Sequence, residues 1–458
     1  MRALYDSKTL TMNDRGIRKL FTKEAKYESW LKLETALAKA QAEFGIIPKE
    51  AADEIEKAAK LENIDLVEME KIYQEIGHGF VPFLKVLVKA CPGDSGKYIH
   101  YGLTTQNIQQ SAQLLVTKQI HDKFMEITAE ILNNLSNLAY EHRNSVMPGR
   151  THGRHATPIT YGYKISVWIS DFLNCVERMK ESEKRVFTIM MGGAVGTFST
   201  MGETGLKIQN RVAEILNMEP MLVPSRNITA HKTEYIMNLA LLANACHKIG
   251  EEVYSTTLEE IGEVSESFKS GTVGSSTMPH KINPKLAKGI IANSQKLYSL
   301  VPVGMYSGAR PYEGDSSSYM LFDGLLEEAL ELMTEILLRC EELTGTLTPH
   351  KEKLLANANL NKGLDNSEFI MMKLSETLGK DKAHELVYEI AIKTAKDGED
   401  FYKNLIGNPL ISEHFSEEEI KFMINPENYT GLSEQIAVDL SQKAKKAADQ
   451  IKKQNSGQ

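Results

Sequence analysis

Long stretches of helical periodicity constrain this chain more than any other feature of its sequence. Apolar residues recur at steps of three to five over about 106–144, 160–189 and 229–267. The pattern returns after Pro284 and again over about 318–343. Such spacing places apolar side chains along one face of an α-helix. Helices of roughly 30 residues are much longer than the globular average of about 11–12, so the pattern predicts an extended helical bundle.

The same pattern indicates how the chain divides. At 458 residues it is too long for one ordinary hydrophobic core. The segment Gly102–Thr105 forms a break before the long central helices, and Thr346–Pro349 follows them. We expect an all-α fold with three helical domains, namely an N-terminal domain over 1–104, a central bundle of five long helices over 105–345 and a C-terminal domain over 346–458. The central helices are apolar on more than one side, which predicts packing against other subunits.

Charge and composition narrow the classes of function. The formal net charge is -8, with 25% charged and 42% hydrophobic residues, which is typical of a globular protein. A negative chain lacks the basic surface that nucleic-acid phosphates require, so we expect no nucleic-acid partner. We find no signal peptide and no run of about 18 apolar residues, so we expect no membrane partner. The four cysteines form no Cys-x-x-Cys pair, which fits reduced thiols and a cytoplasmic location.

One loop, over residues 270–284, carries the densest group of chemically useful side chains. It lies between two long helical patterns and contains Ser275, Ser276, Lys281 and Asn283. Loops held on a rigid scaffold often bind substrates, although a polar linker between helices is the commoner role of an arbitrary loop.

Three segments together resemble the aspartase/fumarase superfamily and, within it, the adenylosuccinate lyase branch. The loop sequence Gly-Ser-Ser-Thr-Met-Pro-His-Lys-Ile-Asn-Pro over Gly274–Pro284 has every fixed position of the superfamily signature Gly-Ser-Ser-x-Met-Pro-x-Lys-x-Asn-Pro. His100–Asn107 is similar to the first family region and Gly149–Pro158 to the second, and Gly193–Thr197 adds a smaller match. The resemblance covers about residues 16–342 and fades in the C-terminal domain.

The resemblance implies an enzyme that eliminates fumarate from a 2-succinyl compound and needs no cofactor. A base removes a proton from Cβ, donors hold the resulting aci-carboxylate, and an acid protonates the leaving group from the opposite face. By position, the implied base is Ser275, the implied acid is His152, and His78 falls where the branch has a second histidine that orients the acid. A serine hydroxyl acts as a base only when donors, a cation and exclusion of water stabilise its alkoxide. The structural alternatives are a turn hydrogen bond for Ser275 and an ordinary exposed loop position for His78.

A second set of residues is implied to bind the substrate. Hydroxyl and amide donors together with a cation suit two carboxylates. The threonines have a structural alternative as N-caps of the helices that follow each region. The implied set consists of His100, Thr104, Thr105, Thr151, Arg154, Ser276, Met278, Lys281 and Asn283.

The resemblance also implies the partners. Family members are homotetramers in which each active site gathers the three regions from three different chains, so we expect a small dicarboxylate substrate and other copies of this chain. Although His152 and His155 are close in sequence, no His-Glu-x-x-His pattern or carboxylate cluster accompanies them. We therefore expect no metal.

One segment departs from the adenylosuccinate lyase pattern. That branch has Glu-Arg-Asp followed by Ser-Ser-x-Glu-Arg, whose arginines and serines hold the nucleotide phosphate. In Arg310–Asp323, Gly314 replaces the first arginine, the second is missing and the segment is shortened. A phosphate dianion without an arginine partner binds poorly, although Arg226, Lys232 or Arg310 could compensate. We therefore expect a smaller leaving group, and an amino acid that carries the 2-succinyl group on nitrogen or sulfur fits best.

Other functions stay open. The first alternative is adenylosuccinate lyase itself with a rearranged phosphate site. A 3-carboxy-muconate cycloisomerase-like enzyme is disfavoured by Thr151 and His152, which that branch tends to lack. A non-catalytic relative is disfavoured because Ser275, Lys281 and His152 are all present.

Overall fold

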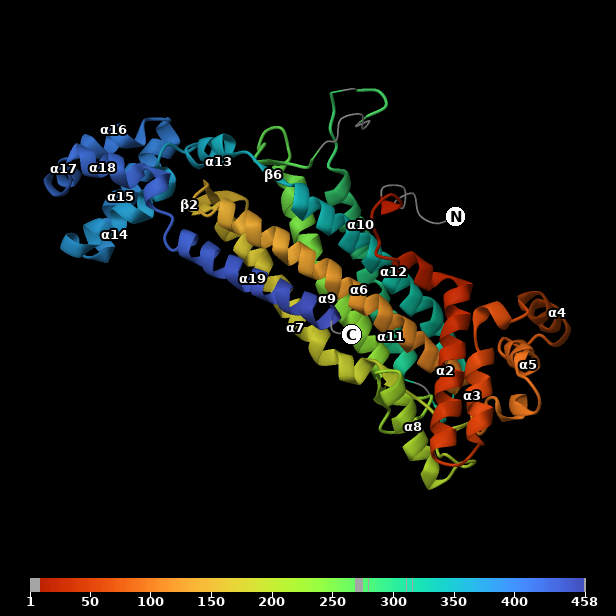
Figure 1. Ribbon diagram of the computed structural model, residues 1–458. Coiled ribbons are helices and arrows are strands. Elements are labelled where there is room, and N and C mark those ends of the chain that lie inside the picture. The colour runs from red at the N-terminus through yellow and green to blue at the C-terminus, as the bar shows by residue number, and fades with distance from the viewer. Residues whose placement is uncertain (1–8, 268–274, 279, 310, 315, 457–458) are drawn as a thin grey trace. The chain divides into compact units, whose positions relative to one another are not determined.

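The structure is a computed structural model that describes residues 9–267, 275–278, 280–309, 311–314 and 316–456. Helices make up most of the described chain and its strands are short, so the expected all-α class is confirmed (Figure 1). The chain forms two compact units. The first unit consists of Met1–Glu126, Cys175–Asn244 and Ala292–Leu338, and the second of Ile127–Asn174, Ala245–Ile291 and Arg339–Gln458. The domain boundaries expected after residues 104 and 345 remain a prediction.

The stretches predicted as long helices are helical. The fourth stretch is divided into two helices, the first of which ends at Tyr298. Pro302 explains the division, because it has no N–H to donate to the carbonyl of Tyr298 four residues earlier. The third stretch ends eleven residues before the predicted 267. The helices are α6 (Thr105–Glu141), α7 (Tyr161–Val186), α9 (Ala230–Thr256), α10 (Lys285–Tyr298), α11 (Leu300–Gly308) and α12 (Ser316–Thr346).

The first unit also holds the N-terminal helices. The hydroxyl of Thr22 caps α2 (Lys23–Glu43) by accepting from the Ala25 N–H, and the buried Trp30 ring of this helix packs against the rings of Phe80 and Phe83. A short parallel pair joins β3 (Thr188–Ile189) to β4 (Glu219–Pro220). The remaining elements are η1 (Ile17–Phe21), α3 (Lys49–Ala58), η2 (Leu61–Asn63), α4 (Leu66–Ile76), α5 (Val81–Ala90), η3 (Ser95–Tyr98) and α8 (Glu203–Ile215).

The second unit contains a β-hairpin that the sequence analysis did not predict. Strands β1 (Val146–Thr151) and β2 (Arg154–Thr160) pair antiparallel, with Thr151 opposite Arg154. The two residues between them, His152 and Gly153, have φ of 52° and 73°. Positive φ at both central positions is typical of the type I′ two-residue hairpin turn, so His152 lies at the tip of a tight turn.

A helical cluster with its own apolar core follows in the second unit. Its core includes Ile370, Leu374, Phe401 and Leu405, all nearly or fully buried. Figure 1 shows α14 to α18 gathered around one another. The elements of this part are β5 (Val264–Ser265), which pairs with β6 (Thr348–Pro349), and α13 (Lys351–Ala358), η4 (Leu364–Asn366), α14 (Ser367–Leu378), α15 (Lys380–Asp397), α16 (Phe401–Ile406), α17 (Pro409–His414), α18 (Glu417–Ile424), η5 (Pro426–Asn428) and α19 (Ser433–Ser456).

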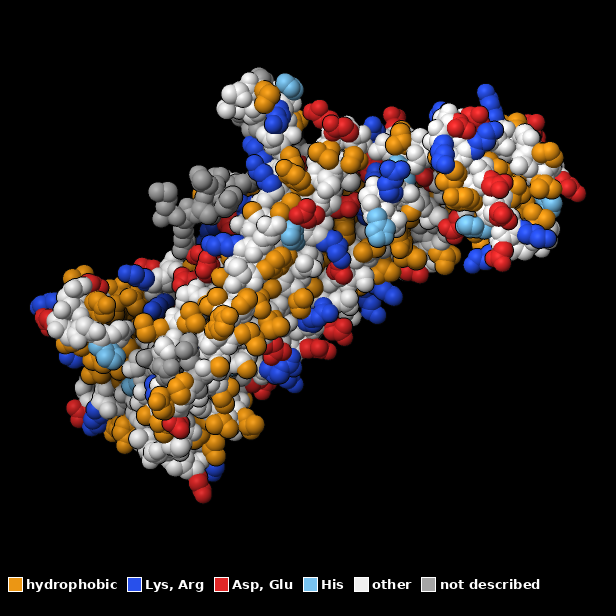
Figure 2. Space-filling view, turned by 180° about the vertical axis from the view of Figure 1, so that it is seen from behind, with side chains coloured by type: hydrophobic (Ala, Val, Ile, Leu, Met, Phe, Trp, Pro, Cys, Tyr) orange, Lys and Arg blue, Asp and Glu red, His pale blue; other side chains and the backbone are white. Residues whose placement is uncertain are grey.

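Large apolar side chains remain exposed on the long helices of the first unit. Met237 and Leu241 of α9 and Met305 and Tyr306 of α11 are between 45% and 73% exposed. Figure 2 shows apolar side chains gathered on one face of the molecule. None of the described helices is both long and apolar enough to span a bilayer. Such a surface is typical of protein that is covered by another protein.

Candidate functional site

His100 of the first region is held firmly within the first unit. Its Nδ1 lies 2.7 Å from Oε1 of Glu34, and its backbone N–H donates to Oε2 of the same carboxylate at 3.1 Å. The Glu34 side chain, on α2, is only 1% exposed. His100 also has a φ of 58°, a conformation that non-glycine residues rarely adopt. One buried carboxylate therefore fixes both the ring and the unusual backbone of this histidine.

The threonines of the first region lie at the beginning of α6 and are partly buried. The backbone N–H of Thr104 donates to Oδ1 of Asn107 at 3.1 Å, and Gly193 N–H donates to the same oxygen at 3.1 Å. Asn107 is fully buried, and its Nδ2 has no partner within the described chain. Its amide oxygen therefore links the backbone at Thr104 to the backbone at Gly193. Sequence reasoning missed this positioning role of Asn107.

His78 lies in the exposed turn between α4 and α5. Its Nδ1 accepts from the N–H groups of Phe80 and Val81, each at 3.1 Å, and so caps the N-terminus of α5. In this chain His78 is an exposed turn residue that caps a helix, and its role in orienting the acid remains a prediction. Because Nδ1 accepts, a neutral ring carries its proton on Nε2, which is left to donate.

In the second unit, the hairpin is anchored while its tip is bare. Arg150 on β1 forms a two-pronged ion pair with Glu263, whose side chain is fully buried and also accepts from Asn357 at 2.9 Å. Thr151, His152 and Arg154 beyond it are exposed. Thr151 ends a strand rather than preceding a helix, so the N-cap alternative is wrong for this residue. Within the described chain, His152 makes no hydrogen bond.

The signature loop shows the same contrast between support and reactive groups. Ser275 is half-buried, and its Oγ accepts from Met278 N–H at 3.1 Å and from Thr277 N–H at 3.4 Å in exposed bonds. Ser276, Met278 and Lys281 are exposed, and Asn283 is partly buried. Gly274, the first residue of the signature, lies outside the described residues. The two donors on Ser275 stabilise negative charge on its oxygen, so a turn bond and a base are compatible roles.

A carboxylate outside the motif supports the end of this loop. Glu266 accepts from the N–H groups of Leu286 at 3.0 Å and Ala287 at 2.7 Å, at the beginning of α10. A negative group at a helix N-terminus satisfies free donors and complements the helix dipole. Glu266 therefore joins the chain just before the loop that carries Ser275 to the helix just after it. Sequence reasoning missed it because nothing along the chain links it to α10.

The structure groups the expected residues into two sets. His78, His100, Thr104 and Thr105 belong to the first unit. Within the described chain, no hydrogen bond joins Ser275 to His152. An active site that gathers its regions from three chains remains a prediction. The second-unit set comprises Thr151, His152, Arg154, Ser275, Ser276, Met278, Lys281 and Asn283.

The segment that departs from the nucleotide-binding pattern contacts one of the three basic residues considered as substitutes. A side chain at position 314 would collide with the guanidinium of Arg226, so Gly314 makes room for that group. The buried Nε of Arg226 has no partner in the described chain. Arg310 lies outside the described residues. Among the described side chains, no cluster of three or more His, Cys, Asp or Glu residues is arranged to hold a metal ion.

The family of this chain is shown by its similarity to known proteins. Residues 10–296 match the model of a family described as lyase, and residues 363–440 match the adenylosuccinate lyase C-terminus. The chain belongs to this lyase family. It is an enzyme of the aspartase/fumarase superfamily in the adenylosuccinate lyase-like branch, and it acts as a lyase.

Three relatives of this lyase bear on its substrate. It is 37% identical to an adenylosuccinate lyase of Methanocaldococcus jannaschii, with 92% of each chain covered. It is 33% identical to an N-acetyl-S-(2-succino)cysteine lyase of Enterococcus italicus, with 91% of each covered. The crystal structure of a fumarate lyase from Mesorhizobium sp. BNC1 matches with a TM-score of 0.86 at 26% identity, over 93% of this chain and 97% of that one.

Proposed function

We propose that this lyase releases fumarate from a 2-succinyl amino acid by anti β-elimination. Ser275 takes the proton from Cβ, the bond from Cα to sulfur or nitrogen breaks as the double bond forms, and His152 gives a proton to the departing thiol or amine. Thr104, Thr105, Thr151, Lys281 and Asn283 bind the two carboxylates as hydroxyl, amide and cationic donors. The other residues of the implied substrate-binding set contact the rest of the substrate, and they are His100, Arg154, Ser276 and Met278.

The observation that carries this choice of substrate is the segment around Gly314. The nucleotide-binding arginines of the branch are absent from it, and Arg226 occupies the space beside Gly314 instead. In the branch two arginines and serines hold the phosphate dianion, and a single guanidinium is a poor substitute for that set. The relative that acts on N-acetyl-S-(2-succino)cysteine supports the same substrate class.

Adenylosuccinate lyase is the second candidate, and the comparisons favour it over the succinyl amino acid. The relative at 37% identity carries that name, and the C-terminal match is to the adenylosuccinate lyase family. In this alternative, Arg226 and the exposed lysines would have to supply the phosphate contacts.

We further propose a homotetramer in the cytoplasm whose active sites are shared by three chains. Support comes from the exposed apolar side chains on α9 and α11 and from the bare tip of the hairpin, which needs a partner surface to exclude water. Light scattering checks the assembly, and a stable monomer with full activity would contradict it.

Substrate comparison tests the choice between candidates. The purified enzyme is incubated with adenylosuccinate, with S-(2-succinyl)cysteine and with an N-(2-succinyl) amino acid, and fumarate is followed by its ultraviolet absorbance. We expect turnover of at least one succinyl amino acid at a kcat/KM above that for adenylosuccinate. Fast turnover of adenylosuccinate alone would establish the second candidate.

A further inference from the structure

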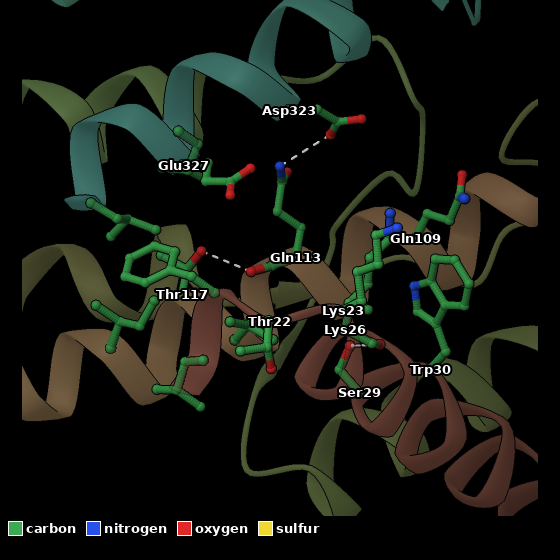
Figure 3. Close-up of a pocket in the computed structure, with 17 residues that line it drawn as sticks. Thr22, Lys23, Lys26, Ser29, Trp30, Gln109, Gln113, Thr117, Asp323 and Glu327 are labelled. Atoms are coloured by element: carbon green, nitrogen blue, oxygen red, sulfur yellow. Dashed lines mark hydrogen bonds between the residues drawn. The ribbon is translucent and has the colours of Figure 1, made fainter. Parts of the chain in front are cut away.

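A pocket of about 340 Å³ lies within the first unit, between α2, α6 and α12. Apolar side chains form its floor at one end, and polar and charged side chains line the rest (Figure 3). None of these residues belongs to the implied catalytic or substrate-binding sets. The volume is in the range of small-ligand sites. Its polar lining comprises Thr22, Lys23, Lys26, Ser29, Gln109, Gln113, Thr117, Asp323 and Glu327.

Opposite charges face one another across this pocket. Lys23 and Lys26 come from α2, whereas Asp323 and Glu327 come from α12 (Figure 3). The Lys26 ammonium lies 5.0 Å from the Trp30 ring centroid, a cation–π contact that positions it. Two cations and two carboxylates give the pocket no net charge. A phosphate dianion would meet the carboxylates, whereas a ligand with one ammonium and one carboxylate has a partner for each.

A chain of hydrogen bonds that begins at a buried lysine fixes the acidic side. Lys232 is 1% exposed and donates from Nζ to Oε1 of Gln113 at 2.9 Å. Because an ammonium can only donate, it forces the amide oxygen of Gln113 to face Lys232. The amide nitrogen then donates to Oδ1 of Asp323 at 3.1 Å, as Figure 3 shows. Asp323 is thus oriented by a chain of bonds, and its second oxygen remains an acceptor.

The titration of this cluster agrees with a cationic ligand. Burial raises the pKa of Asp323 above its ordinary value, while Lys232 and Lys26 act in the opposite direction. Burial lowers the pKa of Lys232 to about 8, against the pull of Asp323. An ammonium bound to Asp323 would stabilise the carboxylate that partial burial disfavours.

Two helices connect the pocket with the first region of the active site. Along α6, Gln109 follows Thr105 by one turn on the same face, a rise of about 6 Å. Along α2, Glu34 lies one turn beyond Trp30 and holds His100. The Phe80 ring lies between those of Trp30 and His100, with centroids 4.8 Å and 5.4 Å away. The polar end of the pocket therefore begins about one helical turn from residues implied to bind the succinyl carboxylate.

We propose that this pocket binds the amino-acid end of the leaving group, with Asp323 taking its free ammonium and Lys26 its carboxylate. The inference rests on the proposed elimination from a succinyl amino acid and adds a specificity. The enzyme prefers substrates in which the succinyl group is attached through a side-chain atom, such as a cysteine sulfur, so that the α-amino group stays free and protonated. Gln113 and Lys232 act as positioning residues for Asp323.

The test compares S-(2-succinyl)cysteine with its N-acetyl derivative, which lacks the ammonium. We expect the wild-type enzyme to have the higher kcat/KM for the free amino compound. Asp323→Asn should lower kcat/KM for that compound about ten- to hundredfold, the range for loss of a charged hydrogen bond, and change it for the N-acetyl compound less than about threefold. Lys26→Gln should weaken both, because both keep the carboxylate.

Matched controls come from the same helices. Glu328→Gln on α12 removes a surface pair with Lys296 and lies outside the pocket lining, and Lys32→Gln lies on α2 outside it. Neither should change the ratio between the two substrates. If Asp323→Asn fails to fold, inhibition of the wild-type enzyme serves instead, and L-cysteine should inhibit more strongly than N-acetyl-L-cysteine.

The outcomes separate the inference from the function beneath it. Equal losses on both substrates in Asp323→Asn, or a wild-type preference for the N-acetyl compound, would overturn the inference while leaving the elimination intact. Absence of fumarate from both compounds would overturn the inference, and absence of fumarate from the N-(2-succinyl) amino acid as well would overturn the proposed function.

Discussion

The two regions that carry the implied active-site residues differ in how they are held. In the first unit, His100 and Thr104 are bonded to buried Glu34 and Asn107 of their own chain. In the second unit, Arg150 and Glu266 fix the hairpin and the loop, but His152 beyond them is exposed. One region is organised before substrate arrives. The other has a hydrogen-bonded support, and the implied acid beyond it is exposed in the single chain.

The largest expected effect separates the two serines of the signature loop. Ser275→Ala should lower kcat about 10³-fold, because the base is lost, while Ser276→Ala should change it less than about tenfold. Both bonds of the Ser275 Oγ are local, so the unfolding free energy should change by less than about 1 kcal/mol. Fumarate release and urea unfolding measure the two quantities. Retained activity in Ser275→Ala would refute the assignment of the base.

The next prediction separates the anchor of the hairpin from its tip. Arg150→Met leaves the carboxylate of Glu263 buried without its cation and should cost about 3–5 kcal/mol of unfolding free energy. Arg154→Met, four residues on and exposed, should cost less than about 0.5 kcal/mol and act on KM instead. Urea denaturation of both variants checks this difference. Equal losses of unfolding free energy in the two variants would show that Arg154 stabilises the hairpin as much as Arg150 does.

The third prediction concerns the buried charge of the first unit. The pKa of Lys232 is lowered from 10.5 to about 8, so the unfolded chain binds more protons between these values. Stability from this group is therefore fully present above pH 10.5 and is lost as the pH falls through 8. The difference corresponds to about 3 kcal/mol for a fully buried group. Unfolding of wild-type and Lys232→Met protein between pH 7 and 10.5 checks it. Parallel stability curves for the two proteins would contradict a buried, charged Lys232.

The smallest expected effect tests how the first region is organised. Glu34→Gln keeps one acceptor for the His100 ring but removes the negative charge, so kcat/KM should fall about tenfold. Glu28→Gln, on an exposed position of the same helix, is the control and should be neutral. Unchanged activity in Glu34→Gln would remove His100 from the implied site.

Sequence periodicity predicted the long helices closely, because apolar spacing along a helix is local information. The division between α10 and α11 also follows from one residue, Pro302, although it was not predicted. The hairpin was missed because its turn depends on a positive φ at His152, and a pattern of apolar residues does not predict that backbone conformation. The lyase family could be predicted from the signature loop because its residues are contiguous.

The supporting residues could not be predicted in the same way. Glu34, Glu263 and Glu266 bond to partners 20 to more than 100 positions away in sequence, so only the fold brings each pair together. The pocket between α2, α6 and α12 was missed for the same reason, since Gln113 and Asp323 are 210 positions apart. Sequence motifs therefore predict the reactive residues of this chain, whereas the residues that position them depend on contacts between distant parts of the sequence.

Running the reaction in reverse in deuterium oxide tests the central claim most directly. Fumarate and L-cysteine are incubated with the enzyme, and the S-(2-succinyl)cysteine formed is examined by proton NMR. An anti elimination run backwards predicts one deuterium at Cβ of the succinyl group in a single stereochemical configuration, formed much faster than with Ser275→Ala. Product formed at the same rate with Ser275→Ala, or deuterium distributed over both Cβ positions, would contradict the account.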